Sequence, residues 1–598
     1  MARYVVGIDL GTTNSALSYA TLPDGDAPPD FRVLPIPQVV SLKEVGARPV
    51  LPSFLYLAAP KEFPAGSLDL AWPGVPDRAV GTFARDQGAR VPGRLVASAK
   101  SWLSHPGVDR RGPLLPWGAP PEVHRVSPVE ASAAYLAHLR DAWNATMAAD
   151  PADRLDRQEV ILTVPASFDA AARDLTVEAI RLAGLENVTL LEEPQAAFYA
   201  WLGAQGDAWR RRVKVGDMIL VCDVGGGTTD FSLIGVADRG GDLALTRLAV
   251  GEHILLGGDN MDLALAYAVA ATLPKGMDGL DQGQRIALNY ACRAAKEALF
   301  ADPTRASAPV TLLGRGSKLI GGTIRAELTR AMLEATILDG FFPMCARTDA
   351  PARDRRVGLT EIGLPYASDP AITRHLAHFL SRQAGSLHAE GGEVRLSAVL
   401  FNGGVFQADP LRDRVERVLQ HWTGDAVPVL ETPDLDLSVA RGAAYYGAAR
   451  AGRGVRIRGG VARSYYIGVE TSGPAVPGVK PPLKAVCVVT MGTEEGTEAE
   501  VPGAEFGLVV GQPAEFRFLG STTRRDDKPG AVLDRWSPEE IQELTTLDTS
   551  LVDDDSTESG DVIPVRLQTV LTEVGTLELW CRSTRDDRRW KLEYNVRD

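Results

Sequence analysis

Apolar and polar positions along the first 450 residues follow two alternating patterns. Compact apolar runs predict strands at Tyr4–Leu10, Glu159–Val164, Met218–Asp223 and Ser397–Phe401. Between them, apolar residues recur at helical spacing, which predicts helices at Pro128–Met147, Ala170–Ala183, Gln284–Leu299 and Arg412–Leu419. Strands that alternate with amphipathic helices are typical of an α/β domain. Stretches rich in proline, glycine and aspartate predict loops or insertions at Leu22–Pro37 and Ala58–Pro76.

The pattern changes near Arg450. Residues 451–463 are rich in glycine and arginine and predict a linker. From residue 464 onward, short alternating strands separated by turn residues predict a small β-sandwich, with strands at Ala485–Thr490, Ala514–Leu519, Val562–Leu571 and Trp590–Val596. Since 598 residues are too many for one hydrophobic core, we expect two domains, 1–450 and 464–598.

The composition of the chain limits which classes of binding partner and which cellular compartment are expected. The formal net charge of −14 argues against sequence-independent binding to nucleic acid or to anionic lipid. The five cysteines are far apart and form no CxxC pair, which favours a reducing compartment over a disulfide framework or a zinc site. No apolar run approaches the length of a membrane span, and the N-terminal run is too short for a signal peptide. We therefore expect a soluble, cytoplasmic protein with no nucleic-acid and no membrane partner.

One sequence pattern occurs twice in the first domain. Tyr4–Leu17 and Met218–Leu233 each read as strand, aspartate, glycine-containing turn, Thr-Thr and a second strand. Glycines let backbone N–H groups approach phosphate oxygens, hydroxyls add donors, and a carboxylate at the strand end suits Mg²⁺ and its waters. No GxxxxGK[ST] motif occurs, so a P-loop is excluded. Two ordinary hairpin turns are the alternative, but two facing hairpins that hold a triphosphate are the device of actin-like ATPases.

The same segments carry a family resemblance. Gly7–Ser15 resembles the first phosphate motif of the DnaK-type heat-shock chaperones (the heat shock protein 70 family), and Asp223–Asp230 is similar to their second. Other segments follow in the family's order across nearly all of residues 1–450: Gly81–Ser104, Ile161–Phe168, Leu191–Ala197, Leu400–Val405, Asp436 and Gly442–Ala444. Ser464–Glu470 looks like the start of the peptide-binding β-domain. The resemblance implies a two-lobed actin-like ATPase domain followed by a β-sandwich.

The resemblance also implies roles for individual residues. Asp9, Asp223 and Asp230, with Thr228, would hold Mg²⁺, its waters and a monovalent cation such as K⁺. Lys100 and Thr228 would face the γ-phosphate of ATP, and Glu193 would orient the attacking water. The remaining contacts to ATP or ADP would come from Gly11, Thr12, Thr13, Asn14, Gly225, Gly226, Gly227, Gly257, Gly258, Lys296, Gly403, Gly404 and Asp436. Pro165 and Arg173 correspond to the interlobe switch, although a plain strand-ending proline is the alternative at Pro165.

The chain departs from the family on the adenine side. Arg293 and Glu297 exchange the usual charges on the adenine-facing helix, so a mutual i, i+4 ion pair is still geometrically available. Gln407 stands where an arginine would flank adenine, so triphosphate binding is better supported than strict adenine preference. Residues 348–383 predict an insertion with a helix over Pro370–Arg382. His375 and His378 on this helix predict a surface helix in preference to a metal site.

The C-terminal part departs further. The length after the linker leaves no room for a long helical lid, and the linker is basic, with Arg453, Arg456 and Arg458. Thr189 replaces the arginine that contacts J-proteins, so stimulation by a generic J-protein is doubtful. A nucleotide-exchange factor is a further candidate partner. Three functions stay open: an ATP-hydrolysing chaperone for extended polypeptides, a nucleotide-gated protein with one dedicated partner, and a small-molecule kinase of the same fold.

Overall fold

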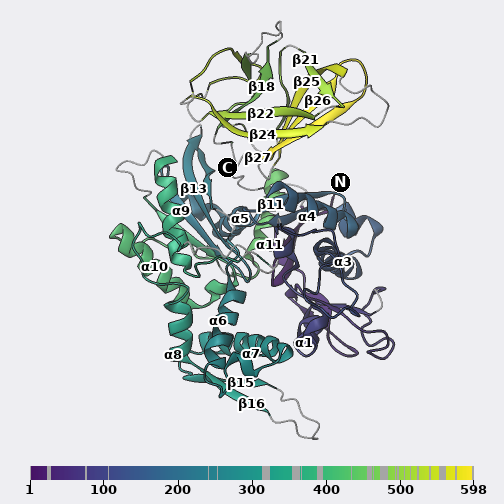
Figure 1. Cartoon of the computed structure of the whole chain (residues 1–598), viewed down its shortest axis with the longest axis vertical. Coiled ribbons are helices and arrows are strands. Elements are labelled where there is room, and N and C mark those ends of the chain that lie inside the picture. The colour runs from purple at the N-terminus through teal and green to yellow at the C-terminus, as the bar shows by residue number, and fades with distance from the viewer. Residues whose placement is uncertain are drawn as a thin grey trace. The chain divides into compact units, whose positions relative to one another are not determined.

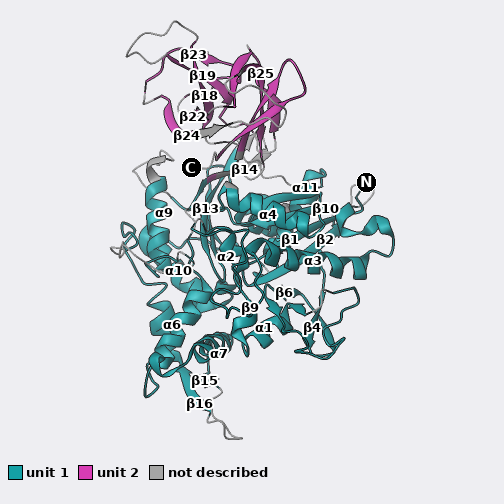
Figure 2. Ribbon diagram, turned by 45° about the vertical axis from the view of Figure 1, so that its right-hand side comes forward, with its two compact units in different colours: residues 1–237, 249–456 teal, residues 238–248, 457–598 magenta. Residues whose placement is uncertain are grey.

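The structure is a computed structural model of the whole chain. It describes all residues except 1, 23–28, 75–76, 106, 240–241, 252–253, 313–322, 353–363, 365, 387–394, 433, 454–460, 462, 472–481, 492, 494–496, 504, 512, 522–523, 525, 538–539, 551–560, 573–575 and 596–598. The chain divides into two compact units, shown in different colours in Figure 2. Unit 1 comprises residues 1–237 and 249–456, and unit 2 comprises residues 238–248 and 457–598. The boundaries 1–450, 451–463 and 464–598 stay predictions, since most of the linker lies outside the described residues.

Unit 1 contains a sheet with the strand order β11-β10-β1-β2-β3, in which β6 also pairs with β2. Strand β1 is parallel to β10 and antiparallel to β2, so the first repeated motif is a hairpin at the centre of this sheet. We call this half of unit 1 the first lobe. Its strands are β1 (Tyr4–Leu10), β2 (Asn14–Thr21), β3 (Arg32–Val33), β6 (Val50–Pro52), β10 (Glu159–Val164) and β11 (Val188–Glu192).

The second repeated motif forms an equivalent hairpin in a second sheet, ordered β14-β13-β12-β17. Here β12 is antiparallel to β13 and parallel to β17, as β1 is to β2 and β10. We call this half the second lobe. Its sheet strands are β12 (Met218–Val224), β13 (Thr229–Arg239), β14 (Asp242–Val250) and β17 (Ala398–Asn402). Residues 238–248, at the end of β13 and in most of β14, are the part of this sheet that is counted with unit 2. The two hairpins predicted from the sequence are therefore confirmed.

Helices surround both sheets (Figure 1). The first lobe carries α1 (Thr82–Gly88), α2 (Ala99–Leu103), α3 (Pro128–Met147), α4 (Ala170–Leu182), α5 (Glu193–Gln205) and α11 (Ser438–Arg450). The second lobe carries α6 (Gly258–Ala270), α7 (Gln282–Ala301), α8 (Arg330–Leu333), α9 (Ile372–Ser386) and α10 (Asp409–Thr423). Small sheets are β4 (Ile36–Ser41) with β5 (Glu44–Arg48), β7 (Leu55–Leu57) with β8 (Arg78–Val80) and β9 (Leu95–Val96), and β15 (Ser307–Leu312) with β16 (Ile324–Thr329).

Two glycines allow α11 to pack closely in the first lobe. A Cβ atom added to Gly7 would lie 2.2 Å from the carbonyl oxygen of Ala440, and one added to Gly442 would lie 1.7 Å from that of Ala196 on α5. No side chain fits at such separations, so both positions require glycine for close approach of backbones. This contact holds α11 against β1, the strand that carries Asp9 as its last residue but one.

Most predicted elements are confirmed with shifts of a few residues at their ends. Leu22–Pro37 is an exception, because its described part contains β3 and the first residues of β4. The helix predicted over Pro370–Arg382 is also confirmed, as α9, but not as a surface helix. Leu376 and Leu380 of α9 are buried, and Phe379 stacks on Phe231 of β13 with ring centroids 5.9 Å apart. Its apolar face therefore belongs to the core of the second lobe.

Unit 2 is a β-sandwich, as predicted. One sheet has the order β23-β19-β18-β22-β24, and in the other β25 pairs with β20, β21 and β26, which pairs with β27. Side chains from both sheets form one core, in which Phe518 stacks between Tyr465 and Tyr594. The strands are β18 (Ser464–Glu470), β19 (Leu483–Val489), β20 (Thr497–Glu500), β21 (Phe506–Val510), β22 (Pro513–Ser521), β23 (Val532–Leu533), β24 (Gln542–Ser550), β25 (Asp561–Leu571), β26 (Thr576–Ser583) and β27 (Arg589–Asn595).

Among the described helices, none combines the length and the apolar character that crossing a bilayer requires.

Candidate nucleotide-binding site

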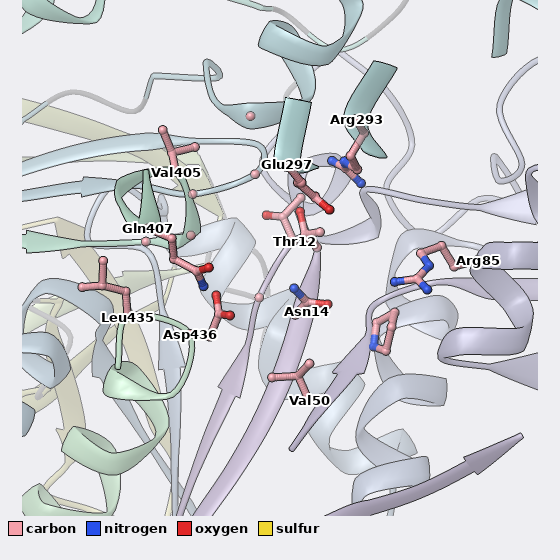
Figure 3. A pocket seen from close by; sticks show the side chains of 18 of the residues that line it. Thr12, Asn14, Val50, Arg85, Arg293, Glu297, Val405, Gln407, Leu435 and Asp436 are labelled. Carbon is pink, nitrogen blue, oxygen red and sulfur yellow. The ribbon is translucent and has the colours of Figure 1, made fainter. Parts of the chain in front are cut away.

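A pocket of about 1060 Å³ lies in unit 1 between the two lobes (Figure 3). Residues of both repeated hairpins line it, together with α1, α2 and α7 and the loop after β17. Among the residues predicted from the sequence to contact nucleotide or to act in catalysis, the lining includes Asp9, Gly11, Thr12, Thr13, Asn14, Lys100, Glu193, Asp223, Gly225, Gly226, Thr228, Gly258, Lys296, Gly403, Gly404 and Asp436. Asp9 and Asp436, which are 427 positions apart in the chain, thus share one cavity.

The two carboxylates that end the hairpin strands have equivalent positions in the two lobes. Asp9 on β1 lies beside Thr163 on the parallel strand β10, whose Oγ1 donates to Asp9 Oδ1 at 3.3 Å. Asp223 on β12 lies beside Asn402 on the parallel strand β17, whose Nδ2 donates to Asp223 Oδ2 at 2.7 Å. Each carboxylate is therefore oriented by a polar side chain from the adjacent parallel strand.

The turns of the hairpins form a cradle in which side chains would not fit. A Cβ atom added to Gly226 would lie 1.9 Å from Oγ1 of Thr13, and one added to Gly11 would lie 2.1 Å from the carbonyl oxygen of Asn14. Thr13 Oγ1 is itself buried without a hydrogen-bond partner. A buried hydroxyl without a partner is costly, and a phosphate oxygen would satisfy it. The cradle therefore fits a phosphate group.

Three predicted residues are next to the pocket but do not line it. Gly227 faces Thr12 and Ser101, and Gly257 abuts the Gly225 carbonyl, where an added Cβ atom would lie 2.6 Å from the oxygen. Asp230 is buried in the second lobe and accepts a hydrogen bond of 2.5 Å from Ser167 of the first. Ser167 and Asn402 are oriented toward the site's carboxylates, a role that the sequence did not predict for them.

Lys100 and Glu193 form an ion pair inside the pocket. Lys100 comes from α2 and Glu193 is the first residue of α5, and both side chains are largely buried. Asp9 and Asp230 interact electrostatically with Lys100, and Asp223 with Glu193, so four carboxylic acids gather around this one lysine at the hairpin end of the pocket. This excess of acidic groups favours binding of a cation.

Burial controls the protonation of the aspartates. It raises the pKa of Asp9 to about 7, with the Glu193 carboxylate as the next cause and Lys100 acting in the opposite direction. It raises the pKa of Asp230 to about 6, against the hydrogen bond from Ser167. The pKa of Asp223 is also raised well above its ordinary range by burial, to which Glu193 adds. Such shifts are expected where carboxylates are buried close to one another.

Direct metal ligation by protein side chains alone finds no support in the described part of the chain. No group of three or more histidine, cysteine, aspartate or glutamate side chains there is arranged to hold a metal ion. His375 on α9 instead lies with Nε2 2.9 Å from the carbonyl oxygen of Asp369. The acidic groups of the pocket thus suit a cation whose other ligands are water and phosphate oxygens, as is usual for Mg²⁺.

The ion pair that the spacing of Arg293 and Glu297 makes available is not the one that Arg293 forms. Arg293 on α7 instead pairs with Asp259 and Asp262 on α6, and Lys296 pairs with Asp262 at 2.6 Å. Burial acts to lower the pKa of Arg293, but the two carboxylates outweigh it and raise it. The partners were missed because they lie on another helix, which the i, i+4 rule does not consider. Figure 3 shows Glu297 and Gln407 at the pocket, where Gln407 bonds to Asp436.

The predicted switch residues lie outside the pocket lining. Pro165 follows β10, and Arg173 is buried on α4. Nη2 of Arg173 donates to the carbonyl oxygen of Ala166 at 3.2 Å and lies 3.6 Å from Oε1 of Glu192, the residue before Glu193. Arg173 therefore connects the segment after Pro165 with the start of α5. Whether this segment acts as a switch stays a prediction.

Each lobe contributes one hairpin and one oriented aspartate to a cradle that fits a phosphate group. This arrangement defines a protein of the actin-like nucleotide-binding fold. Residues 118–352 match the sequence model of the family described as Hsp70 protein. Over these residues the chain is similar to proteins of the Hsp70 type, and its second unit is a β-sandwich.

Curated proteins show the same relationship. The chain is 33% identical over 383 residues to the "Chaperone protein HscA homolog" of Pseudomonas paraeruginosa, covering 60% of this chain and 50% of that protein. It is 33% identical over 439 residues to the protein of the same name from Azotobacter vinelandii, covering 68% and 58%. The match to the one from Methylococcus capsulatus is 32% over 360 residues, covering 56% and 48%. The chain thus spans about half the length of the curated relatives it matches.

Proposed function

We propose that this protein binds ATP with Mg²⁺ in the pocket of unit 1 and hydrolyses it slowly, as an ATP-dependent chaperone for extended polypeptides. The observation that carries the proposal is the convergence of Asp9, Lys100, Glu193, Asp223 and Thr228 in one cavity. Binding of a polypeptide by unit 2 is proposed by analogy with proteins of the Hsp70 type, and it rests on the β-sandwich that follows the nucleotide-binding unit.

Each residue of the pocket has a proposed task. Thr13 and the backbone around Gly226 bind the phosphates, and Asp9 and Asp223 hold the waters of Mg²⁺. Mg²⁺ neutralises phosphate charge and fixes its geometry. Lys100 faces the transferring phosphoryl group, while Glu193, paired with Lys100, orients the attacking water. A strong base is unnecessary, because phosphoryl transfer depends mainly on positioning and electrostatic stabilisation. K⁺ remains a candidate second cation at the acidic site.

Titration calorimetry of the full chain with ATP and Mg²⁺, followed by single-turnover hydrolysis, tests the nucleotide part of the proposal. Binding that needs Mg²⁺ and slow release of phosphate are expected. Absence of binding at millimolar ATP would contradict it.

The proposed binding of polypeptides is tested by capture experiments in ADP and in ATP. Many unrelated polypeptides, held more tightly in one nucleotide state, support a chaperone, whereas one stoichiometric protein supports a dedicated partner.

Among partners, we propose that a generic J-protein does not stimulate this ATPase. Thr189 on β11 accepts a hydrogen bond of 2.7 Å from Arg450 at the end of α11, and the linker that follows is basic in sequence. A basic J-domain surface would meet like charge there. ATPase measured with and without a J-domain decides this, and roughly tenfold stimulation would contradict it. A nucleotide-exchange factor is a further proposed partner. We also propose a cytoplasmic location, which is supported by the five free and buried cysteines.

A further inference from the structure

Three arginines lie directly opposite one another on the second sheet of unit 2. Arg566 on β25 pairs in register with Arg582 on β26, which pairs with Arg589 on β27. Their strand neighbours Leu567, Cys581 and Trp590 belong to the sandwich core. Because side chains alternate along a strand, the arginines lie on the outer face, and all three are exposed. We call Arg566, Arg582 and Arg589 the arginine row.

The fold itself leaves most of this charge unneutralised. Arg566 lies 3.6 Å from Glu505 and remains 70% exposed. Arg582 donates to the amide oxygen of Gln568 at 3.3 Å and has no carboxylate within ion-pair distance among the described side chains. Arg589 likewise has no carboxylate within ion-pair distance among the described side chains, and its guanidinium carbon lies 4.8 Å from the ring centre of Trp580. Paired strands are only ~4.8 Å apart, so like charges directly opposite destabilise the sheet.

The surroundings do not cancel the row. The turn between β26 and β27 carries Arg585, Asp586, Asp587 and Arg588, and thus adds no net charge. Asp586 there pairs with Arg588 at 2.7 Å. On the other side, Glu578 pairs with Lys591 at 3.3 Å, and Glu593 stands opposite Glu578 in register, so these two glutamates offset one lysine and only part of the charge of the three arginines. A concentration of positive charge therefore remains on this face of a protein whose net charge is −14.

Two observations favour carboxylates over nucleic acid as the ligand. Trp580 is the aromatic residue beside the row on the outer face, but the cationic groups of Arg589 and Lys591 lie 4.8 and 5.9 Å from its ring centre, and its Nε1 donates to Glu578 at 2.9 Å. It is thus engaged already and is a poor platform for base stacking. A long polyanion would also feel the net negative charge of the chain, whereas a short acidic segment feels mainly charges within a Debye length of about 8 Å.

We propose that the arginine row is a docking surface for an acidic segment of a partner polypeptide. The planar guanidinium fork binds carboxylates in a bidentate manner, and a segment with several aspartate or glutamate residues would neutralise all three arginines together. The surface is additional to any client-binding part of unit 2 and needs no nucleotide, so it stands or fails independently of the proposed ATPase.

The test measures binding of a fluorescein-labelled, glutamate-rich peptide to the full chain by fluorescence anisotropy, in the absence of nucleotide. Arg582→Ser combined with Arg589→Ser should weaken binding at least about tenfold, since two of the three guanidinium contacts to the peptide carboxylates would be lost together. The matched control, Arg211→Ser with Arg212→Ser in unit 1, removes the same charge elsewhere and should leave the affinity unchanged. Thermal unfolding should show that the row variant is at least as stable as the parent, because like-charge repulsion is relieved.

Three results would overturn the proposal. Equal peptide affinity of the row variant and the parent would show that the arginines do not bind it. An equal loss in the control variant would reveal a general charge effect. Tighter binding of a single-stranded oligonucleotide through the same arginines would assign the surface to nucleic acid instead.

Discussion

Arg110 lies with Nη1 3.5 Å from Oδ1 of Asp169, the residue whose side chain caps the N-terminus of α4. The same arginine donates from Nη1 to the carbonyl oxygen of Leu103 and from Nε to that of His105, both at 2.9 Å. It therefore ties the C-terminal end of α2, the helix that carries Lys100, to the start of α4, which carries Arg173.

This contact predicts an effect on hydrolysis without an effect on binding. Arg110→Met frees the end of α2 and should slow single-turnover hydrolysis about tenfold, or ~1.4 kcal/mol, with ATP affinity nearly unchanged. Asp169→Asn removes only the ion pair, because asparagine caps a helix as well as aspartate does. It should have a small effect. A normal rate in the Arg110 variant would show that α2 needs no such support.

Gly226 gives a test of the cradle. Gly226→Val places atoms where Thr13 Oγ1 and phosphate must lie, and ATP binding should be lost in calorimetry. Gly74→Val is a matched control, because a Cβ atom there meets nothing within 4 Å. Retained affinity in the folded Gly226 variant would contradict the assignment of the hairpin turns to phosphate.

Lys100 gives a test of transition-state stabilisation. Lys100→Ala should lower the rate constant of hydrolysis at least about tenfold, with a smaller change in ATP affinity. Lys275→Ala removes an exposed lysine and serves as the control. If single-turnover kinetics of the two variants agree, Lys100 has no role in the chemical step.

His138 predicts a pH dependence of stability. Burial on α3 lowers its pKa from 6.5 to about 4, and its Nε2 atom lies 2.9 Å from the carbonyl oxygen of Pro37. The unfolded chain takes up a proton near pH 6.5, but the folded chain does so only near pH 4. Stability should therefore fall as the pH falls from about 6.5 to about 4, by up to roughly 3 kcal/mol.

Urea unfolding at several pH values measures this effect. His138→Gln keeps a donor for Pro37 but cannot titrate, so its stability should change less over the same range. The exposed His124→Gln control should behave like the parent. An identical pH profile for the His138 variant would assign the acid sensitivity to other groups.

The repeated hairpins and the sandwich could be predicted because local patterns specify them. Strand, glycine turn and strand are adjacent in sequence, and alternation within β25 or β27 marks the buried face. The partners of Arg293 could not be predicted in this way. They depend on how α6 packs against α7, which tertiary contacts decide. Ser167 illustrates the same limit, because its bond to Asp230 joins the two lobes.

The position of Asn402 could have been predicted from the repeated hairpin motif. The parallel neighbour of β1 places Thr163 beside Asp9, and the repeat implies an equivalent residue beside Asp223. Looking for a polar residue at the end of the strand before Gly403 would have identified Asn402. The arginine row, in contrast, needs the register of three strands, and that register is fixed by the sandwich core.

Because Asp9 and Asp223 are equivalent residues of the two lobes, a bound triphosphate would hold the two lobes together. Each lobe supplies half of the contacts, so a triphosphate would be a bivalent ligand bound by two weak sites at high effective concentration. A small change in the angle between the lobes alters that effective concentration before any single contact is broken. Loss of the terminal phosphate would shorten the ligand and leave the lobes less firmly joined. The number of phosphates in the bound nucleotide would thus determine how freely the two lobes move relative to each other.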